Sequence, residues 1–406
     1  MKFIHSADWQ LGARFAQFGA KSEALRQARL DTLKTALKTA RDRQADAFII
    51  AGDLFEDNQV DDSLATAVLE LFKEFGSVPV FILPGNHDPY TGPDSIWSRR
   101  MFVDAPANLT IFREPKVIEH AGGYLVAAPL AQKVSTIDPS HRIDDLAKSL
   151  PSNAIKIGIT HGAMAIPGKH QPNDFPIDLT AASRAGLDYL AVGHWHNWQI
   201  YDNGRLVMPG TPEPDNFDQT DSGFVACVEV KTHGIPPMVE KLSVATLRWE
   251  AVEFDFLDVE IAKLKFQERI GPLRERANKT VLRVTLKGSA SPSLLETTRQ
   301  WLDSELAGFF VAQIDDQLSV ALSSAELQQL QQDHSLLAHV LGDLAQLEHL
   351  LVGSPPPMGH DSSASISLAD AQQLATNGKI DLSAFNSSHF NLARQILFQK
   401  LREVEA

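Results

Sequence analysis

The sequence contains a single cysteine, Cys227, among its 406 residues. One thiol cannot form an intramolecular disulfide, and it excludes zinc sites built from several cysteines. Any metal ion must therefore be held by histidine and oxygen ligands. Cys227 itself lies in an apolar run, residues 223–230, that predicts a buried strand, so we expect it to fill space in a core.

Long hydrophobic runs are also missing. The longest apolar stretches, residues 47–51 and 78–83, fall far short of the roughly 18 to 20 residues that span a bilayer. The N-terminal segment runs directly into Asp8 and lacks the apolar centre and cleavage site of a signal peptide. We therefore expect no membrane contact and a cytoplasmic protein.

Positive charge is scarce, because 37 Lys and Arg stand against 51 Asp and Glu, for a net charge of -14. Such an excess of acid disfavours non-specific binding of polyanions over the whole surface. Two stretches are nevertheless locally basic: residues 14–43 have eight basic and three acidic side chains, and residues 263–287 have eight and two. A solvated helix face and a phosphate-binding surface both explain such a pattern, and the sequence leaves both open.

The chain has enough apolar residues, 44% of the total, for two or three domains. Over the first 230 or so residues, short apolar runs alternate with longer amphipathic stretches, which predicts a layered α/β architecture. The expected strands are residues 2–5, 47–51, 80–83, 124–128, 155–160, 189–192, 206–208 and 223–230, and the clearest helices are 23–43 and 61–75.

The pattern changes after about residue 245. A strand at 280–286, a helix at 292–307 and short strands at 309–314 and 318–322 predict a small α+β module. A Gln- and Leu-rich stretch then predicts a helix, and a Pro- and Ser-rich stretch predicts a linker. The predicted domains are 1–245, 246–322, a helical segment 323–352, a linker 353–365 and a helical tail 366–406.

Polar residues of an unusual kind follow several of the expected strands, where functional residues concentrate. They are Asp8, Gln10, Asp53, Asn86, His87, Asp88, His161, His194 and His196. Any one of these histidines could equally well be an ordinary core or surface residue. That explanation fails for the group, because its members share a context of neighbouring Gly and Asp residues at strand ends. Mixed carboxylate, amide and imidazole donors suit Mn²⁺, Fe²⁺ or Zn²⁺ rather than Ca²⁺. Two such ions can clamp a phosphate, so the sequence predicts phosphoester hydrolysis.

These segments, in this order and spacing, resemble the calcineurin-like metallophosphoesterase family. Within that family, residues 3–12, 52–55 and 208–214 resemble the SbcD-type DNA repair exonucleases. The resemblance covers about residues 1–230. It implies a four-layer αββα metallophosphoesterase sandwich with a small α+β cap domain and a helical C-terminal tail.

The resemblance also implies a centre for two divalent metal ions, with manganese favoured and iron, zinc or magnesium as alternatives. By position, the ligands of the first ion would be Asp8, Asp53 and His196. The ligands of the second would be Asp53, Asn86, His161 and His194. Asp53 would therefore bridge the two ions.

Three further roles follow from the same resemblance. His87 would stabilise the phosphate or protonate the leaving oxygen, and Asp88 would orient its imidazole. Gln10 stands where the family usually has a histidine. Because a neutral amide is a weaker ligand, we expect it to leave the first ion less tightly bound.

The leading functional hypothesis is a manganese-dependent DNA nuclease that works in DNA repair with an elongated, SbcC-like ATPase. The cap would use its basic residues 263–287 to contact phosphates. The tail would dock on the ATPase through an apolar stripe formed by Phe390, Ala393, Leu397, Leu401 and Val404, unless that stripe packs on its own chain.

Two other functions remain open: a phosphodiesterase for a small nucleotide-type substrate, and a non-catalytic scaffold with a degraded first metal site. The presence of both His87 and Asp88 argues against the scaffold, which needs neither. The sequence leaves open whether the chain forms a homodimer.

Overall fold

The structure is a computed structural model. It describes residues 1–169, 171–256, 259–290, 292–320 and 336–353, together with single residues near the C-terminus. The chain divides into two compact units. The first contains Met1–Glu250 and Lys279–Val281, and the second contains Ala251–Asn278 and Leu282–Ala406.

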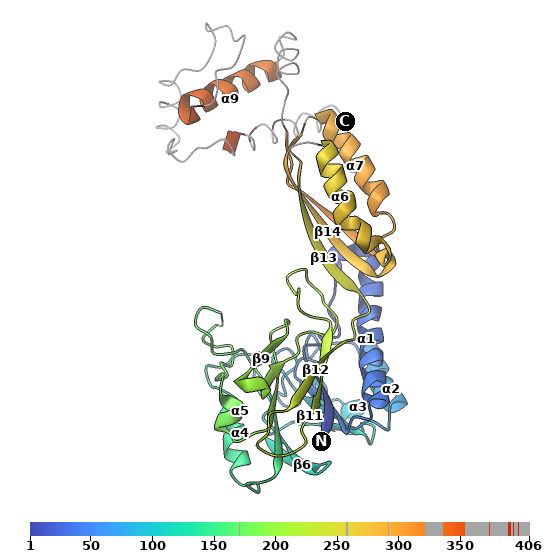
Figure 1. The fold of residues 1–406 in the computed structure, drawn as a ribbon, viewed down its shortest axis with the longest axis vertical. Coiled ribbons are helices and arrows are strands. Elements are labelled where there is room, and N and C mark those ends of the chain that lie inside the picture. The colour runs from blue at the N-terminus through green and yellow to red at the C-terminus, as the bar shows by residue number, and fades with distance from the viewer. Residues whose placement is uncertain are drawn as a thin grey trace. The chain divides into compact units, whose positions relative to one another are not determined.

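The first unit is built on two six-stranded sheets (Figure 1). The first sheet has the order β12 (Met238–Ser243), β11 (Phe224–Glu229), β1 (Lys2–Ser6), β2 (Ala47–Ala51), β3 (Val80–Leu83), β4 (Leu109–Ile111). The second has the order β5 (Lys116–His120), β6 (Gly123–Ala127), β7 (Ile155–His161), β8 (Tyr189–Gly193), β10 (Leu206–Met208), β9 (Gln199–Tyr201). β1 to β4 run parallel, and so do β6, β7, β8 and β10, whereas the remaining strands pair antiparallel.

The two sheets face each other across an apolar core, in which Phe3 and Ile49 of the first sheet meet Leu125 and Ile157 of the second. Helices cover both outer faces, as Figure 1 shows. On the first sheet lie α1 (Ser22–Asp42), α2 (Asp62–Glu74) and α3 (Arg100–Val103), and on the second lie α4 (Ser140–Ala147) and α5 (Ala181–Arg184). Short 3-10 turns are η1 (Ala16–Lys21), η2 (Ile96–Ser98), η3 (Asp202–Gly204) and η4 (Ala277–Lys279). The predicted αββα sandwich is confirmed.

All eight predicted strands of this unit form, as do both predicted helices. The strands that the sequence did not reveal are β4, β5, β9 and β12. All four are edge strands: β12 and β4 end the first sheet, and β5 and β9 end the second. An edge strand is only partly covered, so it needs no continuous apolar run; in β12 the side chains of Met238, Glu240, Lys241 and Ser243 are exposed.

The second unit has an α+β composition. Its sheet has the order β13 (Arg248–Phe256), β14 (Thr280–Ala290), β15 (Val311–Asp316), with β16 (Ser319–Val320) also paired to β14. Its helices are α6 (Val259–Arg274), α7 (Pro292–Leu306) and α9 (Leu336–Val352). Phe266 and Ile270 of α6 pack with Leu282 and Val284 of β14 in a core of their own.

The predicted domain boundaries stay predictions. The first compact unit runs through Glu250 and also contains Lys279–Val281, and α9 lies inside the predicted helical segment 323–352. Most of the predicted linker and tail lie outside the described residues. Among the helices that the structure describes, none has both the length and the apolar character to cross a membrane.

Candidate metal centre

The ligand-bearing segments all lie at the carboxyl ends of parallel strands. Asp8, Asp53 and Asn86 come shortly after β1, β2 and β3 of the first sheet. His161 is the last residue of β7, and His194 is the first after β8, in the second sheet. Because the two sheets face each other, the same ends of both meet, and residues more than a hundred positions apart become neighbours.

The backbone of the site is held in conformations that non-glycine residues rarely adopt. The φ angle is 55° at Asp8, 45° at Gln10, 54° at Asp53 and 129° at His194. Such angles persist only where the surrounding structure fixes them, and they concentrate at functional sites. The sharp turns bring the side chains toward one point.

Glycines allow this close approach. A Cβ on Gly52 would lie 2.0 Å from His161 Nδ1, and one on Gly85 would lie 2.2 Å from Asp53 Oδ1. Both contacts are shorter than atoms tolerate, so the site leaves no room for any side chain at these two positions.

The residues predicted for the second ion converge in the structure. Asn86 Oδ1 lies 2.8 Å from His161 Nε2 and 2.8 Å from His194 Nδ1. Asp53 Oδ2 lies 3.3 Å from the same His161 nitrogen. A carboxylate, an amide oxygen and two imidazoles therefore point at one small region.

The residues predicted for the first ion lie beside this group. Asp8, Asp53 and His161 each offer a donor atom within 4.8 Å of the others, and all three are buried. Asp8 Oδ2 accepts a hydrogen bond from His194 N at 3.0 Å, while its buried Oδ1 accepts none within the described part of the chain. Gln10 is 3% exposed, and its amide nitrogen donates to Asp53 Oδ2 at 3.3 Å.

His196 stands at the edge of the first set. A positive charge on the His196 ring would lower the pKa of Asp8, so His196 lies close enough to interact with that carboxylate. Its Nδ1 lies 2.7 Å from the side-chain nitrogen of Gln219. The structure thus brings the predicted metal-ligand residues to one site, whereas their roles as ligands stay predictions.

The buried charges of the centre compensate one another. Burial raises the pKa of Asp8 above its ordinary value, although His161 and His196 oppose this. Burial would also raise the pKa of Asp53, but the charge and hydrogen bond of His161 outweigh it, so this pKa lies below its usual range. Burial would lower the pKa of His161, yet Asp53 raises it to about 9. Asp53 and His161 thus favour each other's charged forms.

His87 is half-buried beside the centre. Its backbone N–H donates to Asp53 Oδ1 at 2.9 Å, and its Nδ1 lies 3.0 Å from the carbonyl oxygen of Glu56. This carbonyl accepts the Nδ1 proton, which leaves Nε2 as the atom able to meet a substrate oxygen.

The expected contact between Asp88 and the His87 imidazole is not made, which corrects the orienting role given to Asp88. Its carboxylate instead accepts hydrogen bonds from Gly85 N at 2.7 Å and Phe55 N at 3.0 Å. Burial, with the nearby Asp53 charge, raises the pKa of Asp88 to about 7. Buried backbone N–H groups need hydrogen-bond acceptors, and Asp88 supplies them for the turn at Gly85. The His87 ring is instead oriented by the carbonyl oxygen of Glu56.

Sequence reasoning missed Asp174 and Gln219. Asp174 Oδ1 lies 2.9 Å from His194 Nε2, so it fixes the ring with Nδ1 turned toward Asn86. Both residues lie in loops without a motif or a periodic pattern. Only their position relative to the strand ends, which the sequence does not give, could have revealed them.

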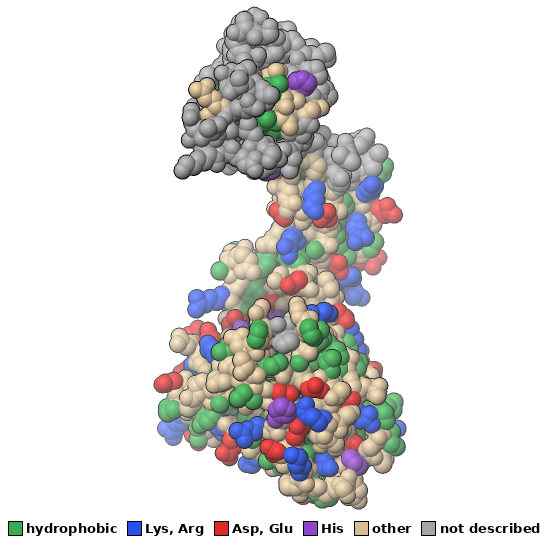
Figure 2. Space-filling model, turned by 90° about the vertical axis from the view of Figure 1, so that its left-hand side faces the viewer, with side chains coloured by type: hydrophobic (Ala, Val, Ile, Leu, Met, Phe, Trp, Pro, Cys, Tyr) green, Lys and Arg blue, Asp and Glu red, His purple; other side chains and the backbone are tan. Residues whose placement is uncertain are grey.

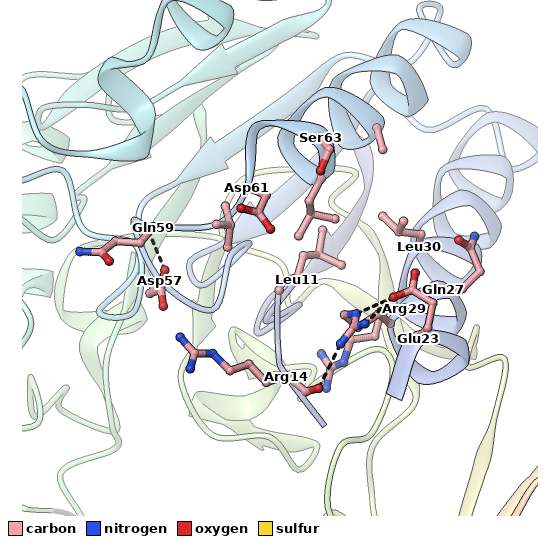
Figure 3. A pocket seen from close by; sticks show the side chains of 15 residues that line it. Leu11, Arg14, Glu23, Gln27, Arg29, Leu30, Asp57, Gln59, Asp61 and Ser63 are labelled. Carbon is pink, nitrogen blue, oxygen red and sulfur yellow. Dashed lines mark hydrogen bonds and ion pairs between the residues drawn. The ribbon is translucent and has the colours of Figure 1, made fainter. Parts of the chain in front are cut away.

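A cavity of about 640 Å³ lies next to the first ligand segment, starting at Leu11 directly after Gln10 (Figure 3). Figure 3 shows Arg14 below Asp57 and Asp61, with the α1 side chains of Glu23, Gln27 and Leu30 to the right. Its charged lining residues are of both signs: Arg14, Glu23, Arg26, Arg29, Asp57 and Asp61.

Most of the basic stretch 14–43 pairs with acidic side chains, as the solvated-face interpretation expects. The pairs are Arg26–Glu23, Arg29–Asp215, Lys34–Glu74, Arg41–Asp42 and Arg43–Glu240.

The donor set fits two divalent metal ions. The orphaned buried Oδ1 of Asp8 needs a partner, and a cation would supply it. The converging donors on Asn86, His161 and His194 are those that Mn²⁺, Fe²⁺ and Zn²⁺ accept. Fold and site together are those of a dimetal hydrolase acting on phosphoester bonds.

Comparisons with known proteins agree with this class. Residues 1–198 match the family model of the calcineurin-like phosphoesterases. The chain is 24% identical over 335 residues to the uncharacterized metallophosphoesterase YhaO of Bacillus subtilis, covering 75% of this chain and 76% of that protein.

Two nucleases are also similar. The DNA double-strand break repair protein Mre11 of Methanosarcina mazei is 28% identical over 58% of this chain and 37% of its own length. The D subunit of the nuclease SbcCD of Escherichia coli K12 is 25% identical over 62% of this chain and 70% of its own. The match with this Mre11 therefore spans well under half of that protein.

Proposed function

We propose that this protein is a metal-dependent phosphodiesterase that cleaves DNA. The observation that carries the proposal is the convergence of Asp53, Asn86, His161 and His194 on one region, with His87 beside it. Two bound cations would polarise the phosphate of an ester substrate, and His87 is placed to protonate the alkoxide that leaves it.

When bound, two divalent ions would supply a Lewis acid that stabilises the charge developing on the phosphate. The chain's own residues divide the remaining work. Asp53 would hold both ions, since its Oδ2 lies 3.3 Å from residues of each ligand set, Gln10 and His161. His87, oriented by the Glu56 carbonyl, would present Nε2 to the phosphate or to the leaving oxygen.

Similarity to two nucleases supports DNA as the substrate. The visible face in Figure 2 carries basic and acidic side chains interspersed rather than one basic stripe. Binding to DNA would then depend on local contacts, and the predicted cluster 263–287 is partly available for them. Lys265 and Arg269 are exposed, whereas Arg274 pairs with Glu305 and Lys287 pairs with Glu253.

The finer parts of the proposal are manganese as the metal, a role in DNA repair in the cytoplasm, and an elongated SbcC-like ATPase as partner. The similarity to one subunit of the SbcCD nuclease supports a partnered nuclease. In the predicted docking stripe, Phe390 is 4% exposed, which favours packing against its own chain at that position. Leu401 and Val404 lie outside the described residues.

A small nucleotide-type diester is the second candidate, and the net charge of -14 is the observation that favours it. The two substrates are distinguished by assaying the full chain with Mn²⁺ on bis-p-nitrophenyl phosphate, on cyclic and dinucleotide diesters, and on end-labelled DNA. We expect hydrolysis of the reporter and of DNA. Cleavage of the small diesters with no cleavage of DNA would contradict the nuclease and favour the second candidate.

Two variants test the assigned residues. Asp53→Asn removes the carboxylate whose Oδ2 contacts both Gln10 and His161, so we expect loss of at least one metal ion by mass spectrometry and nearly all turnover. His87→Ala removes no expected ligand, so it should retain both ions and lose about 10²-fold or more of the rate. An Asp53→Asn protein with both ions and full rate would contradict the assignment.

A further inference from the structure

Arg29 is a charged side chain inside the first unit, on the buried face of α1. It is 1% exposed, and Leu25 and Leu33, one turn away on either side, are buried on the same face. A buried guanidinium is tolerated only where its charge and its N–H groups are compensated. The partners of Arg29 therefore indicate what it holds in place.

One partner belongs to the segment that carries the first aspartate. Arg29 Nη1 donates to the carbonyl oxygen of Trp9, which stands between Asp8 and Gln10. These two neighbours have φ angles of 55° and 45°, in the left-handed region. Residues other than glycine keep such angles only when their surroundings fix them, and a buried hydrogen bond to the intervening carbonyl does this.

The second partner leads to His196. Arg29 Nη2 donates to Asp215 Oδ2 at 2.6 Å. Asp215 N donates to Gln219 Oε1 at 2.9 Å, and Gln219 Nε2 donates back to Asp215 Oδ1 at 2.6 Å. These two bonds fix the amide, whose nitrogen lies 2.7 Å from His196 Nδ1. The amide N–H therefore donates to Nδ1, and the proton of the neutral imidazole lies on Nε2, so this contact fixes the ring in the tautomer that cannot bind a cation through Nε2.

We propose that Arg29 is a positioning residue for the first metal ion. It holds the Asp8–Gln10 segment through the Trp9 carbonyl, and Asp215 in turn holds the guanidinium in place. The inference deepens the proposed dimetal function and rests on it. It also explains why a buried arginine stands at a position of α1 where an apolar residue would pack without cost.

The second metal set has supports of its own. His161 Nδ1 lies 2.8 Å from the carbonyl oxygen of Ala51, and His194 Nε2 lies 2.9 Å from Asp174. Neither contact involves Arg29. Weakening the Arg29 network should therefore affect the first ion and spare the second.

The test is a calorimetric titration of the metal-free full chain with Mn²⁺, in the wild type and in the Arg29→Lys and Asp215→Asn variants. Asp8→Asn identifies which of the two binding steps belongs to the first ion. We expect the dissociation constant of that step to rise about tenfold or more in both variants, and that of the other step to change less than about twofold. Lys34→Ala is the matched control, because Lys34 lies on the same helix in an exposed ion pair with Glu74.

Asp215→Asn keeps the inference falsifiable if Arg29→Lys fails to fold, since Asp215 is only half-buried and outside the apolar core. In Asp215→Asn, an unchanged first dissociation constant, with or without a lower melting temperature, would overturn the positioning role. The KM for the reporter at saturating Mn²⁺ should stay unchanged. A wild-type chain that binds fewer than two Mn²⁺ ions would overturn the dimetal function itself and this inference with it.

Discussion

At the scale of single residues, specific contacts compensate buried polar side chains in the described part of the chain, although a few atoms such as Asp8 Oδ1 lack a partner there. Asp8, Asp53 and His161 compensate one another at the metal centre. Glu213, by contrast, is compensated by hydrogen bonds from Thr32 Oγ1 and from backbone N–H groups. The two situations lead to different predictions.

Gln10 tests the first metal site. We expect Gln10→His to lower the Mn²⁺ concentration for half-maximal reporter hydrolysis several-fold, because imidazole is a better donor than an amide for such ions. Gln10 now donates to Asp53 Oδ2, and the side chain is buried beside that carboxylate. An unchanged Mn²⁺ requirement, measured by titrating metal into the metal-free enzyme, would show that residue 10 is no ligand.

Glu213 tests the effect of burial on stability. Burial raises its pKa from 4.5 to about 7, because the hydrogen bonds and Arg29 only partly oppose the loss of solvent. The folded chain thus binds a proton more tightly than the unfolded chain. This contribution is fully present below about pH 4.5 and is lost as the pH rises through about 7, at up to about 1.4 kcal/mol per pH unit.

The measurement is urea unfolding between pH 5 and 8 in wild type and Glu213→Gln. The difference in free energy of unfolding, wild type minus variant, should fall with rising pH. Glu240→Gln is the control, because Glu240 lies in an exposed pair with Arg43 and should leave the slope unchanged. A pH-independent difference for Glu213→Gln would contradict the raised pKa.

At the scale of elements, the helices differ in how they use their charges. In α1 most basic side chains pair with nearby acids, and Arg29 is buried. In α6, Lys265 and Arg269 are exposed. The sequence could not separate these cases, because a basic residue in a helix has the same spacing in either environment.

The exposed face of α6 gives a prediction about DNA. Charge reversal at both positions, Lys265→Glu with Arg269→Glu, should weaken DNA binding and flatten its dependence on salt by about two units of slope, because two phosphate contacts are lost. Hydrolysis of the small reporter should not change. Reversal of Arg274, which pairs with Glu305, is a comparison that instead disturbs packing. Equal losses on DNA and reporter would indicate misfolding rather than lost phosphate contacts.

At the scale of the whole molecule, the chain has two compact units with separate cores. Every metal-centre residue, from Asp8 to His196, belongs to the first unit. Stability and chemistry of the centre should therefore be insensitive to the end of the chain.

Deletion of residues 378–406 tests this separation. We expect reporter hydrolysis and the melting temperature to remain nearly those of the full chain, while co-purification with the proposed ATPase is lost. A large fall in melting temperature would instead show that the tail packs on its own chain, as the burial of Phe390 favours. Differential scanning calorimetry on both chains gives the answer.

The strands that carry the site were readable from sequence because they are buried on both faces and thus continuously apolar, as in β2 and β3. Asp8, Asp53, Asn86, His161 and His194 were identifiable for the same reason, since each stands at the end of such a strand. Edge strands such as β12, half exposed to solvent, gave no comparable pattern.

By itself the sequence determined the buried strands of a layered α/β architecture and the residues that gather at the metal centre, because strand burial and strand-end motifs are local properties. The four-layer αββα arrangement came from the resemblance to a known family. Only the tertiary structure decided what holds those residues. Arg29 and Asp215 are 186 positions apart, Asp174 meets His194 from a separate loop, and the Glu56 carbonyl replaces Asp88 as the partner of His87. A hydrogen bond between distant segments depends on chain geometry at both ends, and neither composition nor periodicity records it.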